Sequence, residues 1–382
     1  MRALFVFSLL YLFYTWIGYL TIICIISKLV KRRTIHCDPG YKPFVSILIS
    51  AYNEANVIGK RIENLLSLSY STDLYEILVG SDGSTDDTVQ IARKYTDQRV
   101  KVIDFQNNRG RADVHNDLIK LAKGPILVFT DADTVFTPGF VENIVKPFCD
   151  PKIGAAVGKL AYNISGGDIA ENEGIYWKYD LKIKELENAI GIVNNGTGAC
   201  MAIRKELFKA LAPVDDVDTA TVVDIICQGF EVSYVQDAVA YDIPPHSLKS
   251  EFKMRIRGTS KTLSSLGRRA NLSVFIKNPI LCWSVLSHRV FRYFTPYLMI
   301  ALFFTNLYLI SENRIYLTTF YFQTVFYLLA VIGWIANSRK RNLPLASSAF
   351  SFCTAMSGMM IGVAKALSGR VTVTYQTDDT VH

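Results

Sequence analysis

The chain has 382 residues, 50% of them hydrophobic, and a mean hydropathy of +0.21. Water-soluble domains of this length rarely average so apolar, so the composition predicts membrane segments. The formal net charge is +7, but the cations cluster beside apolar runs, which is typical of cytoplasmic membrane flanks and argues against a nucleic-acid partner. Seven cysteines without a CxxC pair predict reduced thiols, with neither a disulfide framework nor a zinc site.

The first predicted element is a transmembrane helix with a basic flank, over residues 1–33. Residues 3–27 carry no charge and are long enough to span a bilayer. Their length and the lack of a small-residue cleavage site argue against a signal peptide. The cations after the apolar run outnumber the one before it: Lys28, Lys31, Arg32 and Arg33 against Arg2. The positive-inside rule therefore predicts that the N-terminus lies outside and the following chain in the cytoplasm.

Residues 44–245 have the pattern of a water-soluble α/β domain. The expected strands are "FVSILIS", "EILVGS", "VKVIDF", "PILVFT" and "GAAVGKL". The expected helices between them are "EANVIGKRIENLLSL", "DDTVQIARKYT", "ADVHNDLIKLA" and "PGFVENIVKPF". This alternation predicts a largely parallel sheet with helices on both faces. Ligands of such sheets bind beyond the carboxyl ends of the strands.

The remainder of the chain is predicted to be associated with the membrane. Residues 246–290 mix large apolar side chains with many cations, which favours amphipathic helices in the membrane interface. Residues 291–337 hold two apolar runs separated by "SENR" and closed by "SRKR", which predicts a transmembrane hairpin that goes out and returns.

A last apolar stretch, 344–366, precedes a tail of residues 367–382. It carries Gly358, Gly362 and Ala366 at four-residue spacing, which suits tight helix packing in a membrane. A re-entrant, an interfacial and a spanning course are all open. The first two are favoured, because a full span would place Lys365 and Arg370 outside.

Polar clusters follow the predicted strands. They are "SAYNEAN" with Glu54, "SDGSTDDT" with Asp82, "NNRGRADVHN" with Arg109, Arg111 and Asn116, and "TDADT" with Asp131 and Asp133. The second cluster has an ordinary explanation as well, because Ser84 and Asp87 have the spacing of a helix capping box and Asp-Gly is a common turn.

Asp131 and Asp133 stand two residues apart at the end of an apolar strand. Residues at this spacing on an extended chain point to the same side, and two adjacent carboxylates repel unless a cation lies near them. Mg²⁺ or Mn²⁺ accepts such ligands and completes its shell with water and phosphate oxygens. The pair therefore predicts a metal site for a nucleotide diphosphate, with a solvated turn as the alternative.

A further acidic cluster lies in residues 213–235, with Asp215, Asp216, Asp218 and Asp224. Acidic residues at a helix N-terminus are favoured by the helix dipole, and this explanation suits Asp215 and Asp216. One carboxylate of the cluster could instead be a general base that deprotonates a hydroxyl.

Together these segments, with "GTGACMAIRKELF", resemble the membrane-integrated family 2 glycosyltransferases, which include hyaluronan, chitin and cellulose synthases and many exopolysaccharide enzymes. The resemblance runs from about Val45 to Leu266. It implies a GT-A fold, a UDP-sugar donor, Mg²⁺ or Mn²⁺, and inversion at the anomeric carbon. The implied acceptor is lipid-linked or a growing polysaccharide, and membrane lipids are the other partner.

The resemblance also implies roles for single residues. Asp133 is the principal metal ligand with Asp131 beside it, and Asp218 is the base. Residues implied to contact the nucleotide sugar are Tyr52, Glu54, Asp82, Arg111, Asn116, Asp131 and Arg255, and those implied to contact the acceptor are Thr197 and Gly198.

Several positions depart from the family pattern. Arg111 stands where the family usually has Lys, and His115 where it has Leu. Val217 precedes Asp218 in place of an acidic residue, and the QxxRW box is replaced by a sequence with Phe252 and Ile256. That box is associated with continuous polymerisation. These departures keep a second hypothesis open, a catalytically inactive, membrane-anchored nucleotide-binding or regulatory protein on the same fold.

Overall fold

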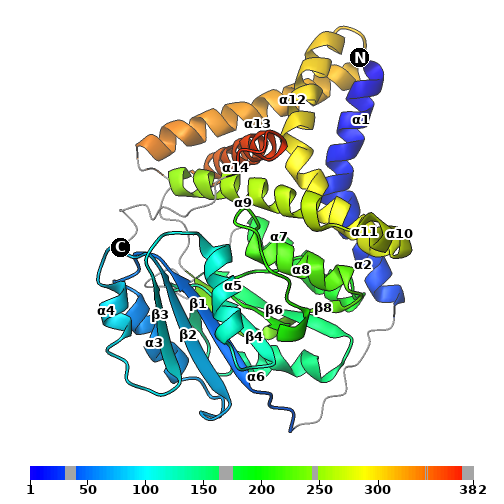
Figure 1. Ribbon diagram of the computed structural model, residues 1–382. Helices are drawn as coiled ribbons and strands as arrows, with labels where there is room; N and C mark the ends of the chain where they lie inside the picture. Colours follow the sequence, from blue (N-terminus) through cyan, green and yellow to red (C-terminus); the bar gives the residue numbers. More distant parts are fainter. Residues whose placement is uncertain (31–39, 163–174, 243–247, 340, 342, 372–382) are drawn as a thin grey trace. The chain divides into compact units, whose positions relative to one another are not determined.

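The computed structural model describes residues 1–30, 40–162, 175–242, 248–339, 341 and 343–371 (Figure 1). The chain forms two compact units, each described by itself. The helical unit consists of Met1–Ile22, Pro245–Leu263 and Trp283–Val371. The sheet unit consists of Ser264–Cys282 and the described residues of Ile23–Pro244.

The sheet unit is built on eight strands in the order β3-β2-β1-β4-β7-β6-β8-β5. The strands are β1 Val45–Ala51, β2 Tyr75–Asp82, β3 Val100–Phe105, β4 Ile126–Thr130, β5 Val135–Phe136, β6 Ile153–Tyr162, β7 Met201–Arg204 and β8 Glu231–Asp242. All five strands predicted from the sequence are present. From β3 to β4 the neighbours are parallel, whereas β7 runs antiparallel to both β4 and β6, and β5 antiparallel to β8. The expected largely parallel sheet is therefore correct for four strands and mixed beyond them.

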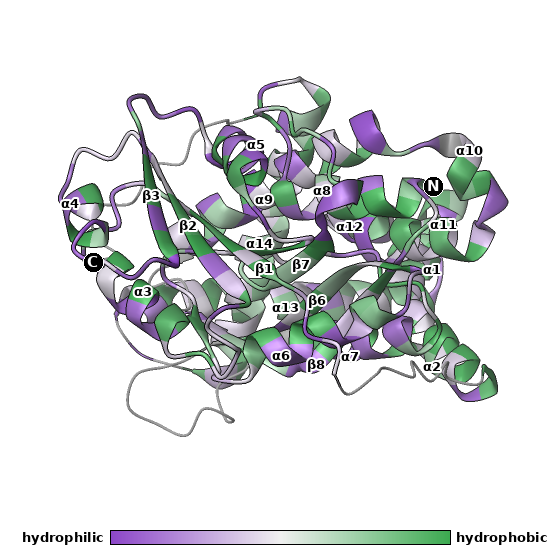
Figure 2. Ribbon diagram, turned by 60° about the horizontal axis from the view of Figure 1, so that its bottom comes forward, coloured by the Kyte–Doolittle hydropathy of each residue, from purple (hydrophilic) through white to green (hydrophobic). Residues whose placement is uncertain are grey.

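Helices cover both faces of this sheet, as the sequence predicts. The helices of the unit are α3 Ile58–Leu66, α4 Thr88–Ala92, α5 Arg111–Leu121, α6 Phe140–Val145, α7 Ile175–Ala189, α8 Val217–Cys227 and α10 Leu272–Lys277, with 3-10 turns η2 Lys146–Cys149 and η3 Lys205–Leu207. Ile47 of β1 packs with Ile62 of α3 and Ile144 of α6 in the core of one face. On the other face lies α5, where a Cβ at Gly80 would be 2.6 Å from Val114. The central strands are hydrophobic because they are buried on both sides (Figure 2).

The helical unit begins with one continuous helix made of α1 Arg2–Phe13, π-helical η1 Tyr14–Gly18 and the start of α2 Tyr19–Leu29. The later helices are α9 Leu248–Arg269, α11 Pro279–Val285, η4 Leu286–Val290, α12 Phe291–Leu309, α13 Arg314–Ser338 and α14 Pro344–Leu367. Among the described residues three helices are long and apolar enough to cross a membrane: Arg2–Leu29, Arg314–Ser338 and Pro344–Leu367. The chain therefore has membrane-spanning capacity at both ends of its sequence.

The helix α12 lies in the first half of the predicted hairpin but is not among those three. It carries Arg292, Pro296 and the buried Asn306. Asn306 accepts a hydrogen bond from Thr319 of α13 at 2.9 Å and donates one to Gln323 at 3.2 Å. The polar side of α12 is thus satisfied by its neighbour in the hairpin, as a helix away from water requires.

The helix α14 packs closely on α9 through its glycines. A Cβ at Gly358 would lie 2.9 Å from Cβ of Arg255, and one at Gly362 would lie 2.6 Å from Cβ of Thr259. The four-residue spacing of small residues therefore brings two helices together, as expected from the sequence.

The expectation for the cysteines holds only in part. The free thiols are those of Cys24, Cys200, Cys227, Cys282 and Cys353. Cys149 is disulfide-bonded, so the expectation of no disulfide is wrong at this position. A disulfide at this position leaves no spacing signal such as CxxC, and composition could not reveal it.

Candidate active site

The loops that follow β1 and β2 are fastened to each other at the carboxyl end of the sheet. Asn53 adopts a left-handed conformation (φ 56°), and its side-chain oxygen accepts a hydrogen bond from the backbone N–H of Thr85 at 2.8 Å. The backbone N–H of Glu54 donates to the Thr88 hydroxyl at 2.8 Å. This pairing holds the loop that carries Glu54 against the loop that follows β2.

The capping box expected for Ser84 and Asp87 is wrong. Asp87 is the N-cap of α4 without a side-chain capping bond. The carboxylate of Asp86 accepts from the N–H of Thr88 at 3.1 Å and from Ala55 at 3.1 Å, while the Ser84 hydroxyl accepts from the N–H of Asn53 at 3.1 Å. The polar side chains of this segment therefore form hydrogen bonds to the loop that follows β1, in place of the capping bond expected at the start of α4.

Asp82, at the end of β2, is buried, and both its oxygens are engaged. They accept hydrogen bonds from the backbone N–H groups of Arg109 and Gly110, each at 2.8 Å. Gly110 has φ +95°, which glycine adopts without strain. Asp82 therefore shapes the turn into α5 and places Arg111 at the first helical position, and its predicted contact with the nucleotide remains a prediction.

Asn116 has a comparable structural task. Its amide donates to the backbone carbonyl of Leu211 and accepts from the N–H of Leu211, each at 2.8 Å. The amide holds α5 against the segment before α8. A contact between Asn116 and a nucleotide sugar would require these two hydrogen bonds to be given up.

Arg111 lies between two of the predicted site carboxylates. Its Nη2 atom is 2.7 Å from Oδ1 of Asp131, with each side chain about a third exposed (33% and 32%). Burial acts to lower the pKa of Arg111, but Asp131 and Asp218 outweigh it and raise the pKa above its ordinary value. The guanidinium is therefore the cation that separates Asp131 from Asp218.

Asp218 comes from the first turn of α8, next to the loop that precedes β7. A Cβ at Gly198 would lie 2.1 Å from Oδ1 of Asp218, and one at Gly196 would lie 2.7 Å from its backbone oxygen. Within the described part of the chain, Oδ1 of Asp218 is buried and accepts no hydrogen bond. A buried carboxylate oxygen without a donor is costly unless a ligand supplies one. The "GTGAC" loop and Asp218 thus lie side by side, and the role of Asp218 as the base stays a prediction.

The other aspartates of the cluster are structural. Asp216 is the N-cap of α8 and accepts from the N–H of Thr219 at 3.3 Å, which matches the helix-end explanation. Asp215 is buried and ion-paired with Arg269 at 2.5 Å and with Arg268. Arg269 also pairs with Asp224. For Asp215 the helix-dipole explanation is therefore wrong, because its partners lie on α9, some fifty residues along the chain.

Two buried groups shape the charge around the Asp131–Asp133 turn. Burial first, and then the negative charges of Asp133, Asp131 and Asp86, raise the pKa of Glu54 to about 8. Arg61 of α3 is buried behind the turn, where burial lowers its pKa to about 9 while Asp131 and Asp133 oppose this shift. Its Nη2 atom donates to the Thr130 hydroxyl at 2.6 Å.

These carboxylates suit a hard divalent cation. Among the described residues no group of three or more His, Cys, Asp or Glu side chains is arranged to hold a metal ion by itself. After burial, the negative charges of Asp133 and Asp131 both raise the pKa of Glu54, so the three carboxyl groups lie near one another. One or two carboxylates, completed by diphosphate and water, are the usual set for Mg²⁺ or Mn²⁺ with a nucleotide. The residues present therefore fit the predicted metal.

The remaining predicted residues are less constrained. Tyr52 follows β1 and Thr197 lies between the two glycines of the loop, both partly exposed. Arg255 belongs to α9 in the helical unit, with its Nη2 3.7 Å from Glu251. Its predicted contact with the diphosphate stays a prediction. The sequence missed Arg61 and the partners of Asp215, because a lone Arg in a helix and a pair distant in the chain give no motif.

The sheet and the position of its carboxyl-end residues define the GT-A class of fold. The chain superposes on a mannosyltransferase from Pyrobaculum calidifontis solved in complex with GDP-Man and Mn²⁺, with a TM-score of 0.71 and 20% identity, covering 96% of this chain and 99% of that one. At this identity the likeness establishes the fold.

Residues 46–212 match the model of Glycosyl transferase family 2. The chain is 26% identical over 223 residues to poly-beta-1,6-N-acetyl-D-glucosamine synthases of Staphylococcus aureus and Staphylococcus epidermidis, covering 56% of this chain and 53% of each relative. The chain spans about half the length of the curated relatives it matches. It therefore contains a domain that matches Glycosyl transferase family 2, the family that its motifs resemble.

Proposed function

We propose that the protein is an inverting, metal-dependent glycosyltransferase at the cytoplasmic face of a membrane. It transfers a sugar from a UDP donor to a lipid-linked or growing polysaccharide acceptor in surface or exopolysaccharide synthesis. The observation that carries the proposal is the meeting of Asp131, Arg111 and Asp218 beside Gly198, from four separate segments of the sheet unit.

The chemical step follows from the buried oxygen of Asp218. The acceptor hydroxyl oxygen forms a bond to the anomeric carbon while the bond from that carbon to the donor's phosphate oxygen breaks. The hydroxyl proton passes to the carboxylate of Asp218, whose Oδ1 has no donor among the described residues. The diphosphate leaves with the electron pair of the broken bond, and a single displacement inverts the configuration.

Asp133 and Asp131 would hold the metal. A bound divalent ion stabilises the negative charge that develops on the departing diphosphate. Arg111 neutralises Asp131 and lies close to Asp218 without contacting it through a described hydrogen bond. Arg255 is proposed as a second cation for the diphosphate.

The donor is proposed from the relatives. Their name assigns them a polymer of N-acetyl-D-glucosamine, which supports an N-acetylhexosamine donor for this chain. The Pyrobaculum calidifontis enzyme was solved with GDP-Man, which makes GDP-mannose the competing donor and supports Mn²⁺ as a metal to test.

The orientation in the membrane is supported by contacts inside the helical unit. Arg2 pairs with Glu312 at 2.7 Å, so the N-terminus lies beside the connection between α12 and α13. Both are predicted to be outside, and the cation-rich ends of the same helices inside. Of those cations, Lys31, Arg32, Arg33 and Lys340 lie outside the described residues.

The proposal is tested by incubating purified protein in lipid with labelled UDP-N-acetylhexosamines, UDP-hexoses and GDP-mannose, with and without Mn²⁺. Metal-dependent label in lipid extract or polymer from a UDP-sugar, lost in Asp218→Asn, supports it. Transfer from GDP-mannose alone would contradict the UDP assignment. The anomeric configuration of the product, read by NMR, decides between inversion and retention.

The alternative hypothesis, a catalytically inactive nucleotide-binding protein, predicts a different result. It expects UDP binding without transfer or hydrolysis of any donor, and no effect of Asp218→Asn. The retained proximity of Arg111, Asp131 and Asp218 favours the enzyme, because nothing would preserve a costly arrangement of charges in a site without chemistry.

A further inference from the structure

His115 is a buried histidine one helical turn after Arg111 on α5. Its side chain is fully buried, and its ring lies edge-on to Phe129 at 5.1 Å between centroids. The Nε–H of Arg111 donates to Nε2 of His115 at 3.4 Å. This long bond is the one polar contact that the described residues give the imidazole, since Nδ1 is buried without a partner.

The protonation state of His115 follows from this contact. An arginine Nε–H can only donate, so Nε2 of the imidazole must carry a lone pair and Nδ1 the proton. Burial and the charge of Arg111 lower the pKa of His115 well below its ordinary value. The imidazole is therefore neutral throughout the physiological range and serves as an acceptor.

The guanidinium of Arg111 is held at two points. Its Nε–H donates a hydrogen bond to Nε2 of His115, and its Nη2 atom forms an ion pair with Asp131 at 2.7 Å. These two contacts lie along one edge of a rigid, planar group and restrict both its position and its plane. The plane so fixed brings Nη2 beside Gly198, where a Cβ would be 2.5 Å from it and 2.1 Å from Oδ1 of Asp218.

We propose that His115 is a positioning residue that holds the Arg111 guanidinium between Asp131 and Asp218, so that Arg111 and His115 act as one unit in the transfer reaction. The inference rests on the proposed function. A lysine has no Nε–H to donate from the middle of its side chain, and a leucine cannot accept, so each residue is useful with the other.

Kinetics of four variants test the coupling: His115→Leu, His115→Gln, Arg111→Lys and the double variant Arg111→Lys with His115→Leu. We expect His115→Leu to lower kcat about 10- to 100-fold with a KM for the donor changed less than about 3-fold. His115→Gln keeps an acceptor and should recover most of kcat. The double variant should be no slower than Arg111→Lys alone, because the second change removes a contact already lost.

Stability measurements separate positioning from packing. His115→Leu removes a buried polar ring and should leave the unfolding temperature equal to or above that of the wild type. Val114→Ala, at a fully buried apolar position on the same helix, is the matched control and should lower the unfolding temperature while kcat stays unchanged. Full kcat in His115→Leu, or effects of the two single changes that multiply in the double variant, would overturn the proposal.

A readout independent of activity keeps the two proposals distinguishable. In protein labelled with ¹⁵N-histidine in lipid nanodiscs, the imidazole shifts of His115 should report a neutral ring protonated at Nδ1 from pH 5 to 8, and Arg111→Lys should change them. An imidazolium, or a ring protonated at Nε2, would refute the positioning role even in an active enzyme. Absence of transfer from every donor in the wild type would refute the proposed function, while the imidazole shifts would still decide the pairing.

Discussion

Gly198 and Asp218 lie so close that a Cβ on the glycine would be 2.1 Å from Oδ1 of the aspartate. Real Cβ atoms do not approach an oxygen this closely, so a larger residue would displace the carboxylate. The glycine therefore belongs to the site through the space it leaves for Asp218 and Arg111. An acceptor contact of Gly198 itself, implied by the family resemblance, would be additional to this role.

Gly198→Ala should reduce transfer at least about 100-fold while changing the unfolding temperature by only a few degrees. The atoms that must yield are the ends of two side chains, which move at low cost, but their movement misplaces the proposed base. Activity and thermal unfolding measured on the same preparation check this.

Gly267→Ala is the matched control, because a Cβ at this position of α9 meets nothing within 4 Å. It should leave transfer unchanged and stabilise the helix by about 0.5–1 kcal/mol. Activity of Gly198→Ala above half the wild-type value would show that Asp218 does not need this space.

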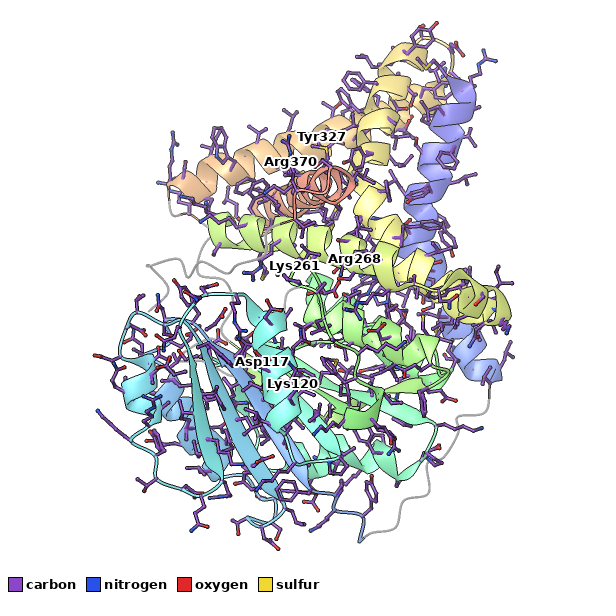
Figure 3. The ribbon with its side chains drawn as sticks, viewed as in Figure 1. Asp117, Lys120, Lys261, Arg268, Tyr327 and Arg370 are labelled. Carbon is purple, nitrogen blue, oxygen red and sulfur yellow. The ribbon has the colours of Figure 1, made fainter. Side chains whose placement is uncertain are left out.

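Asp133→Ala should abolish the effect of metal on nucleotide binding. With a principal ligand removed, UDP should bind with the same affinity in Mn²⁺ and in chelator, as measured by calorimetry. Asp117→Ala removes a carboxylate from the outer side of α5, where Asp117 pairs with Lys120 at 2.8 Å (Figure 3), and should keep the full metal effect. A retained Mn²⁺ dependence in Asp133→Ala would assign the metal to other residues.

The pH dependence of metal binding should report Glu54. Its pKa of about 8 means that the carboxyl is mostly protonated at pH 7, held so by burial and then by Asp133 and Asp131. A divalent cation at those aspartates offsets their charge, lowers the pKa of Glu54 and expels its proton. Metal-dependent UDP affinity should therefore rise as pH increases from about 6.5 through 8.

The raised pKa of Glu54 also makes the stability of the folded protein fall as the pH increases. A carboxyl whose pKa is raised in the folded state binds more protons there than in the unfolded chain, so it costs stability as pH rises through the folded value. Glu54→Gln mimics the neutral acid and should remove both pH dependences with little loss of affinity at pH 7. An unchanged slope in this variant would trace the proton to another group.

The sequence predicted the parts of the fold that depend on local pattern. The five apolar runs became strands, and the polar clusters lie at their carboxyl ends, because burial and the geometry of parallel strands determine both. It did not predict which partners the polar groups would choose. Asp82 and Asn116 match a binding motif, yet both form hydrogen bonds with backbone groups. Several hydrogen-bond partners could satisfy the same side chain, and the three-dimensional fold determines which one it contacts.

Ion pairs between residues far apart in the sequence were the hardest contacts to predict. Asp215 and Arg269 are separated by more than fifty residues, and no periodicity or spacing joins them. Arg61 is one cation in an amphipathic helix, and its burial behind Thr130 depends on how α3 meets the sheet. The motifs therefore predicted which segments carry the candidate site residues, whereas the buried charges around them required the three-dimensional structure.

Substituting Arg269 should test how much its buried ion pairs contribute to the stability of the fold. Its guanidinium serves two buried carboxylates, those of Asp215 and Asp224, and Arg269→Met leaves both of them without this cation. Breaking a buried ion pair from one side costs about 3–5 kcal/mol, because the remaining charge stays desolvated. Thermal or denaturant unfolding should show a loss of this size, with Asp218, on the same helix as Asp224, becoming less ordered and transfer falling as a result.

The stability lost in Arg269→Met should be smaller at low pH than at high pH. Burial raises the pKa of Asp224 even with Arg269 beside it, so the folded state already takes up a proton there more readily than the unfolded chain. Without Arg269 this preference grows, and the deficit of Arg269→Met should shrink as pH falls from 8 toward 5, because protonation removes the uncompensated charge. Lys120→Met breaks an exposed pair and should cost less than about 1 kcal/mol at any pH in this range. A deficit of Arg269→Met that stays constant from pH 5 to 8 would mean that lost packing, and not the two carboxylates, sets its size.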